Sequence, residues 1–255
     1  KIADLEKIYR TEEVETVALN KLSIEVKEGE FVAIMGPSGC GKSTLLNMLA
    51  RLHEPTSGRI LIDGRDIRDY RVDSLRRRLG IVLQENVLFA GSVRDNIALG
   101  KQHATDEEVL EAARLAGVES FIAGHPMGYD MPISEGGRSL SGGQKQAIGL
   151  ARVLIRKPRV LFLDEPTAHF DVRSEAEFLE RLKALRDERM TIIISTHRLS
   201  LLGMVDRLLL FDNGRLVADG PRDKVMAILQ GKPAPAAAES FAGVASRGQK
   251  PDAAT

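Results

Sequence analysis

Short apolar runs alternate with helix-like stretches along most of the chain. Continuous apolar runs at 31–35, 81–83, 160–163 and 191–194 are typical of strands that are buried on both faces. Between them, residues 43–52, residues 105–124 and a stretch that begins at Ser141 and ends at Pro158 place apolar side chains at helical spacing. This alternation predicts an α/β fold with a largely parallel sheet wrapped by helices.

Turn residues mark a further strand and a hairpin. Residues 60–62 are followed by Asp63-Gly64, which predicts a strand and a turn, and residues 207–211 and 215–218 flank Asp212-Asn213-Gly214, which predicts a terminal hairpin. After residue 231 the chain becomes rich in Ala, Pro, Gly and Ser, which cannot offset ordering entropy by burial. We therefore expect one folded domain over residues 1–231 and a disordered tail over residues 232–255.

Composition narrows the class of protein. The 255 residues carry 36 Lys and Arg against 36 Asp and Glu, which argues against a nucleic-acid-binding domain. A single Cys cannot form an internal disulfide, and no apolar run reaches the length of about 18–20 residues that a membrane span needs. The first residue is Lys and no signal-peptide pattern follows. We expect a soluble, intracellular domain with a cut or processed N-terminus.

Residues 36–43 read Gly-Pro-Ser-Gly-Cys-Gly-Lys-Ser, which fits the phosphate-binding pattern G-x-x-x-x-G-K-[ST] between a predicted strand and helix. Glycines let backbone N–H groups close around phosphate oxygens, Lys42 reaches the β- and γ-phosphates, and Ser43 ligates Mg²⁺. The alternative is a Gly-rich turn that precedes Lys-Ser-Thr by chance. The expected nucleotide-binding residues here are Gly36, Ser38, Gly39, Cys40, Gly41, Lys42, Ser43 and Thr44.

The apolar run 160–163 ends in two carboxylates, Asp164 and Glu165. Asp164 is placed to hold Mg²⁺ through water, whereas Glu165 is free to orient or deprotonate an attacking water. Alone, Asp164 could be an ordinary strand-end turn residue. Paired with the phosphate-binding loop, the two carboxylates predict hydrolysis of a nucleoside triphosphate.

A rarer motif narrows the class further. Leu140, Ser141, Gly142, Gly143 and Gln144 read LSGGQ, lie before the acidic strand and open a helix. In this order of motifs the chain resembles the ATP-binding cassette family over about residues 1–230. The resemblance implies a catalytic and metal-binding Q-loop glutamine at Gln84, a D-loop aspartate at Asp171, a switch histidine at His197 and an adenine-stacking aromatic at Tyr9.

The resemblance also implies an architecture: a P-loop NTPase (RecA-like) core with a parallel sheet, an N-terminal antiparallel β subdomain and a helical signature subdomain over about residues 85–157. ATP and Mg²⁺ are the implied cofactors. The helix opened by Ser141 makes a second phosphate-binding end. The resemblance implies that it faces the γ-phosphate held by a second cassette, so that an ATP-bound homodimer encloses two nucleotides head to tail.

Simpler readings exist for individual residues. Tyr9 could be an ordinary strand tyrosine, although an aromatic face suits a base. His197 alone could be structural, but it follows a parallel strand, where such folds bind ligands. Cys40 stands where many relatives have Ser, and we expect a tolerated residue whose thiol can be alkylated.

Other segments resemble particular subfamilies. Residues 84–97 and 128–137 look like the Q-loop region and X-loop of exporter cassettes, and residues 55–230 are closest to type I secretion exporters. Residues 1–50 look instead like the ATPase subunits of lipoprotein-release and macrolide-efflux systems. We hypothesise a natural or engineered chimera with a seam near residues 48–56. The D-loop departs from the family, with His169 and Phe170 where small or aliphatic residues are usual.

Together these features predict the ATP-hydrolysing subunit or excised domain of an ABC exporter. It would act at the cytoplasmic face of a bacterial plasma membrane with transmembrane domains that this sequence lacks, and without nucleic acid. One alternative is a cassette ATPase of DNA repair, chromosome organisation or translation, but the chain has no coiled-coil insertion, zinc-binding cysteines or second cassette. Another is a nucleotide-binding module with little turnover.

Overall fold

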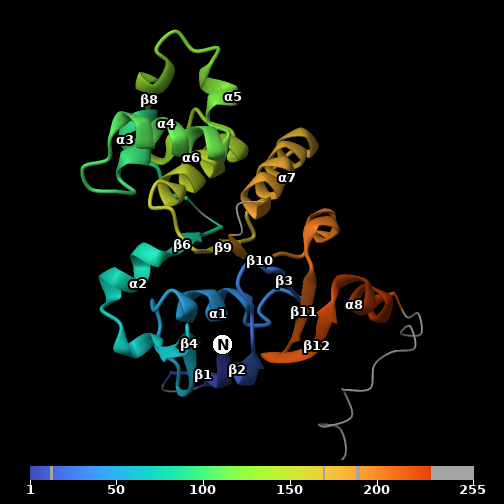
Figure 1. Cartoon of the computed structure of the whole chain (residues 1–255). Helices are drawn as coiled ribbons and strands as arrows, with labels where there is room; N and C mark the ends of the chain where they lie inside the picture. The colour runs from blue at the N-terminus through green and yellow to red at the C-terminus, as the bar shows by residue number, and fades with distance from the viewer. Residues whose placement is uncertain (12–13, 85, 169, 188–189, 231–255) are drawn as a thin grey trace, which may run out of the picture.

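A six-stranded sheet runs through the middle of the molecule (Figure 1). The computed structural model describes residues 1–11, 14–84, 86–168, 170–187 and 190–230, so the predicted tail at 232–255 lies outside the described residues. The sheet is parallel except at β12, and its strands, in spatial order, are β12 (Arg215–Pro221), β11 (Arg207–Asp212), β3 (Phe31–Met35), β10 (Thr191–Ser195), β9 (Val160–Asp164) and β6 (Leu79–Val82).

Two smaller sheets complete the strand set of the described residues. An antiparallel sheet at the N-terminal end contains β2 (Glu15–Ile24), β1 (Ile2–Arg10), β4 (Ser57–Ile62) and β5 (Arg65–Asp66). A two-stranded piece contains β7 (Gly91–Ser92) and β8 (Pro132–Ile133). The predicted α/β class, the parallel core sheet and the N-terminal antiparallel sheet are therefore confirmed.

Both faces of the central sheet are covered, which explains why its strands are continuous apolar runs. In β10, Ile192 and Ile194 face one core and Ile193 faces the other, and Leu161 and Phe162 of β9 divide in the same way. The first core includes side chains from helices α4, α6 and α7, while the second is shared with α1 and the antiparallel sheet. Because successive side chains of a strand point to opposite faces of the sheet, each of these strands contributes side chains to both cores.

Helices α3 to α6 gather at one end of the molecule, away from β1, β2 and β4 (Figure 1). None of the helices in the described part of the chain is long and apolar enough to cross a membrane. Their bounds are α1 (Lys42–Leu49), α2 (Val72–Arg78), α3 (Val93–Ala98), α4 (Asp106–Ala116), α5 (Glu119–Ile122), α6 (Gly142–Leu154), α7 (Val172–Asp187) and α8 (Arg222–Leu229), with 3₁₀ turns at Ile67–Asp69, Gly128–Asp130, Glu135–Gly137 and Leu199–Met204.

Most predicted elements are present, with three differences in the helices. The helix predicted from Ser141 to Pro158 ends at Leu154. The helix predicted over 43–52 ends at Leu49. The single helix predicted over 105–124 is two helices, because Gly117 adopts φ 73° and caps α4 in the left-handed conformation. Apolar spacing continues across that glycine, so the pattern alone does not show the break.

Candidate nucleotide site

The predicted functional residues follow four neighbouring parallel strands. β3 leads into the phosphate-binding loop, β10 into His197, β9 into Glu165 and β6 into Gln84. The register aligns Ser195 of β10 with both Ile34 of β3 and Asp164 of β9. The carboxyl ends of these strands therefore meet at one edge of the sheet, where open α/β sheets bind ligands.

Close backbone packing fixes the phosphate-binding loop between β3 and α1. Gly41, the residue before α1, has φ 100°, and a Cβ there would lie 2.3 Å from the carbonyl oxygen of Ala18 in β2. Cys40 is 3% exposed and belongs to the core between the two larger sheets, so its thiol is shielded in the folded chain and the expectation that it can be alkylated is wrong there. Ser38, Gly39 and Ser43 are exposed, while Gly36 and Thr44 are partly buried. The loop is thus anchored on one side and open on the other.

Lys42 is nearly buried, and its ammonium group binds the loop itself. Its Nζ donates to the carbonyl oxygens of Gly36 at 2.6 Å and Pro37 at 2.9 Å, and lies 3.6 Å from Sγ of Cys40. These contacts hold the cation inside the curve of the loop, which places positive charge beside the N-terminus of α1.

Glu165 and His197 form a close pair at the same edge. Oε2 of Glu165 lies 2.9 Å from Nδ1 of His197, with the glutamate side chain 13% exposed and the histidine side chain 64% exposed. Glu165 has φ 43°, and its backbone N–H donates to the carbonyl of Ser195 at 2.9 Å. The left-handed backbone turns the carboxylate out of β9 toward the end of β10.

Asp164 fits the predicted role of a metal-binding carboxylate. Its Oδ1 is buried, and within the described ranges no hydrogen-bond donor reaches it. A buried carboxylate oxygen without a donor is unfavourable unless a cation or its water shell is bound there. Asp164, together with the hydroxyl of Ser43 and the amide oxygen of Gln84, supplies the oxygen donors that Mg²⁺ prefers.

The LSGGQ segment caps helix α6 as the sequence predicts. Ser141 Oγ accepts from the N–H of Gln144 at 3.2 Å, and Gln144 Oε1 accepts from the N–H of Ser141 at 2.9 Å. Leu140 is 9% exposed and packs into the core below. Gly142 lines a cavity of about 320 Å³ together with Gln84 and Glu165. The signature helix therefore begins beside the glutamine and the carboxylate at the strand ends.

Comparison with known proteins decides the family. A family model described as "ABC transporter" matches residues 19–168, more than half of the chain. The chain belongs to the ABC transporter family. Its motifs and its α/β core are those of that family's ATP-binding cassette, an ATPase domain.

Individual relatives of this ABC cassette are described as export proteins. The chain is 43% identical over 213 residues to a Staphylococcus aureus protein named as a multidrug export ATP-binding/permease protein, and 45% identical over 208 residues to YgaD of Bacillus subtilis, which carries the same description. These matches cover 84% and 82% of this chain but 37% and 36% of the relatives, so the chain spans little more than a third of their length.

A solved structure shares the fold. A bacterial Atm1-family ABC exporter with ATP bound superposes with a TM-score of 0.82 at 40% identity, covering 89% of this cassette and 39% of that chain. All three of these relatives are described as exporters. The hypothesis of a chimera with a seam near residues 48–56 and the resemblance to type I secretion exporters stay predictions.

In this ABC cassette, Asp171 stabilises the start of α7. Its Oδ1 accepts from the backbone N–H of Ser174 at 2.8 Å and its Oδ2 from the Ser174 hydroxyl at 2.9 Å. The pKa of Asp171 is lowered because the backbone and hydroxyl of Ser174 donate to its charged form. A Cβ on Gly143 would lie 3.1 Å from Ser174 of α7, so the signature packs against the residue that Asp171 binds.

Phe170, the aromatic residue at a D-loop position where small or aliphatic residues are usual, has a packing role. Phe170 meets Phe178 of α7 edge to face, with ring centroids 5.5 Å apart, and packs against the core below α7. Phe170 therefore serves as an anchor for the D-loop, and His169 lies outside the described residues.

Tyr9 lies on β1 and is 38% exposed. Nζ of Lys7 is 5.0 Å from the ring centroid, and the ring of His53 is perpendicular to it at 6.2 Å. β2, the neighbour of β1, contacts Gly41, which places the hairpin beside the phosphate-binding loop. Adenine stacking on Tyr9 remains a prediction.

A buried hydrogen-bond network near the Q-loop has no local signal in the sequence. Asn96 of α3 is 1% exposed, and its side chain joins Phe89 and Ser92 in the segment after Gln84 to Arg152 of α6. Arg152 adds bonds to the carbonyls of Asn96 at 2.9 Å and Val87 at 2.8 Å. Asn96 lies within the exporter-like segment 84–97, but its partner Arg152 lies 56 positions away.

Proposed function

We propose that this cassette binds ATP with Mg²⁺ and hydrolyses it to drive an exporter. The observation that carries the proposal is the contact between Glu165 and His197, next to Asp164, at the sheet edge that also bears the phosphate-binding loop. A carboxylate that is oriented by a neighbour and not needed for metal binding can act as a base toward water.

The phosphate-binding loop would hold the nucleotide. Backbone N–H groups of residues 36–44 would surround its phosphates, and Lys42 would exchange the carbonyls of Gly36 and Pro37 for phosphate oxygens. Ser43, Gln84 and Asp164 would hold Mg²⁺, which when bound neutralises charge on the β- and γ-phosphates. Tyr9 would stack on the adenine.

Glu165 would take a proton from the attacking water through its carboxylate. The neighbouring His197 would hold that carboxylate in position with Nδ1 and would contact the γ-phosphate with the rest of its exposed ring. Gln84, which lines the same cavity as Glu165, would help to position the water.

A second copy of this cassette would complete each site. The N–H of Gln144 is already bonded to Ser141, whereas the N–H groups of Gly142 and Gly143 lie in the first helical turn, where intrahelical acceptors are absent. They therefore suit the γ-phosphate on a partner cassette, as the head-to-tail model requires. Asp171, in contact with the signature through Ser174, would lie at the same interface.

The exported substrate would pass through membrane domains that join this cassette at the cytoplasmic face of the bacterial plasma membrane. Support comes from relatives described as multidrug export ATP-binding/permease proteins, of which this chain matches little more than a third. The helical region around α3–α6, proposed to extend over residues 85–157, would carry the contact.

Complementation between two inactive variants tests the composite site. Lys42→Ala removes the phosphate-binding cation, and Ser141→Arg blocks the signature, so each homodimer should be inactive. An equimolar mixture forms heterodimers with one intact site, and we expect about a quarter of the original rate to return. No recovery would contradict the head-to-tail dimer, and no turnover of the unmodified chain at any concentration would leave only a nucleotide-binding module.

A further inference from the structure

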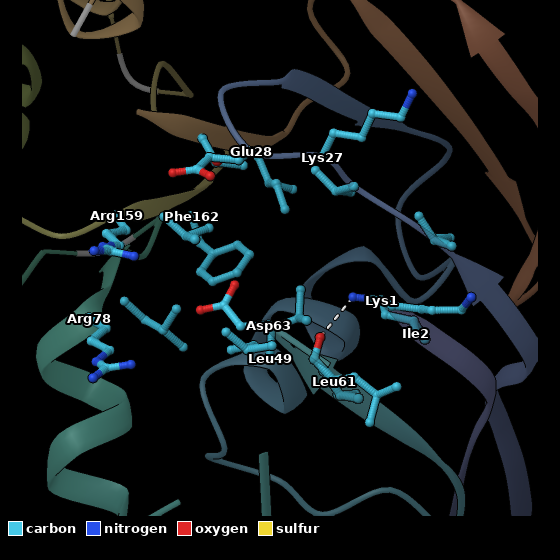
Figure 2. A pocket seen from close by; sticks show the side chains of 18 residues that line it. Lys1, Ile2, Lys27, Glu28, Leu49, Leu61, Asp63, Arg78, Arg159 and Phe162 are labelled. Carbon is cyan, nitrogen blue, oxygen red and sulfur yellow. Dashed lines mark hydrogen bonds between the residues drawn. The ribbon is translucent and has the colours of Figure 1, made fainter. Parts of the chain in front are cut away.

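A separate cavity lies at the opposite end of the central strands from the nucleotide site. It is lined by Val160 and Thr191, which begin β9 and β10, whereas Asp164 and Ser195 end those strands. Its volume is about 180 Å³ (Figure 2). A ligand here would be one sheet length away from the catalytic carboxylates.

Apolar side chains of the core form the inside of this cavity. They come from both larger sheets and from the end of α1, and five of them keep between 5% and 8% of their surface exposed although they belong to the second core: Ile2, Ile24, Leu49, Leu79 and Ile193. Phe162 lies among them and is labelled to the left of the centre of Figure 2. Packed cores leave few such openings, so this one offers an apolar body a place to bind.

The mouth of the cavity carries charge. Arg78 and Arg159 lie on the same side of it (Figure 2), and the backbone N–H of Arg159 donates to the carbonyl of Arg78 at 3.0 Å. Across the described ranges, neither guanidinium has a carboxylate within 4.0 Å. Lys1 and Lys27 also line the cavity, at the other side of the view, whereas the carboxylates of Glu28 and Asp63 lie on the side of the two arginines (Figure 2).

We propose that this cavity binds a small carboxylate whose apolar body is a single ring or a short alkyl chain. A dry cavity of about 150 Å³ holds a benzene-sized molecule, so 180 Å³ suits one ring with a short side arm. Two neighbouring guanidinium groups suit a carboxylate because each offers parallel N–H donors to its two oxygens. Over the whole lining, four basic side chains also outnumber the two carboxylates.

The test uses 3-phenylpropanoate as the probe, without nucleotide, and the full chain. Titration is followed through the isoleucine δ1-methyl signals, because Ile2, Ile24, Ile60, Ile62 and Ile193 all line the cavity. We expect shifts at these methyls with binding in the millimolar range or tighter, and weaker binding by at least fivefold for 3-phenylpropan-1-ol and 3-phenylpropan-1-amine.

Charge variants on the surface provide the second arm, since they leave the core unchanged. Arg78→Gln and Arg159→Gln should each weaken the carboxylate by about tenfold, while Arg77→Gln, one residue away on α2 and outside the lining, should leave binding unchanged. Absence of shifts at these isoleucines would overturn the proposal. Equal binding of the alcohol or the amine would also overturn it, because the site would then be merely apolar or would select cations.

Discussion

Asn96 should be among the most sensitive polar positions of the cassette. Its Oδ1 accepts from the N–H of Phe89 at 3.0 Å and from Arg152 at 2.9 Å, and its Nδ2 donates to the carbonyls of Phe89 at 2.9 Å and Ser92 at 3.0 Å. With the side chain 1% exposed, these four bonds hold the segment that follows the Q-loop against α3 and α6. Asn96→Ala removes all four.

The expected loss of stability follows from those bonds. Each contributes about 1 kcal/mol, and buried partners left without a bond add to the loss, while the half-buried guanidinium of Arg152 regains some water. The net effect is about 3–4 kcal/mol. With a urea dependence of about 3 kcal/mol per molar for a chain of this size, the unfolding midpoint should fall by about 1 M.

Urea unfolding followed by far-UV circular dichroism measures this shift, since the chain has no Trp for fluorescence. Gln102→Ala, exposed beyond the end of α3, serves as the control and should change stability by less than about 0.5 kcal/mol. Combining Asn96→Ala with Arg152→Ala should give less than the sum of the two effects, with a coupling of about 1 kcal/mol. If Asn96→Ala unfolded at the same urea concentration as the control Gln102→Ala, the reasoning would be refuted.

Three further outcomes follow from the site. The carboxyl of Asp171 should titrate below its ordinary pKa of 3.8, and Ser174→Ala should raise that pKa, which carboxyl NMR can follow. Because the pKa is lower in the folded state, the contribution of Asp171 to stability is complete above pH 3.8 and is lost as the pH falls through the folded pKa. The Cys40 thiol, 3% exposed, should react with a disulfide reagent far more slowly in the native protein than in urea, and equal rates would contradict its burial. Asp164→Asn should raise the Mg²⁺ concentration for half-maximal ATP turnover by about tenfold, and an unchanged requirement would remove Asp164 from the metal site.

The sequence-based prediction was strongest where one local pattern determined one local structure. The run 191–194 has no polar interruption because β10 is buried on both faces, and the capping box of Ser141 and Gln144 lies within four residues. Strand ends were equally predictable, since parallel neighbours bring their carboxyl ends to one edge. These features gave the α/β core and the placement of the loop, Asp164, Glu165 and His197.

Contacts between distant residues could not be predicted in this way. The bond between Asn96 and Arg152 joins two helices, and the cavity beneath Phe162 depends on how two sheets pack. Gly117 divides a helix because of its left-handed backbone, which apolar spacing does not encode. The bonds from Lys42 to its own loop also have no counterpart in the sequence pattern, because that pattern encodes binding of phosphates and not of the loop carbonyls.

The role of Glu165 is the central claim, and turnover of Glu165→Gln tests it most directly. Glutamine keeps the size of the side chain but cannot take a proton, so ATP hydrolysis should fall by about 10²–10⁴-fold while ATP binding persists and the ATP-bound dimer becomes more stable. Glu180→Gln, an exposed change on α7, should hydrolyse ATP at the original rate. Hydrolysis by Glu165→Gln at that same rate would contradict the account.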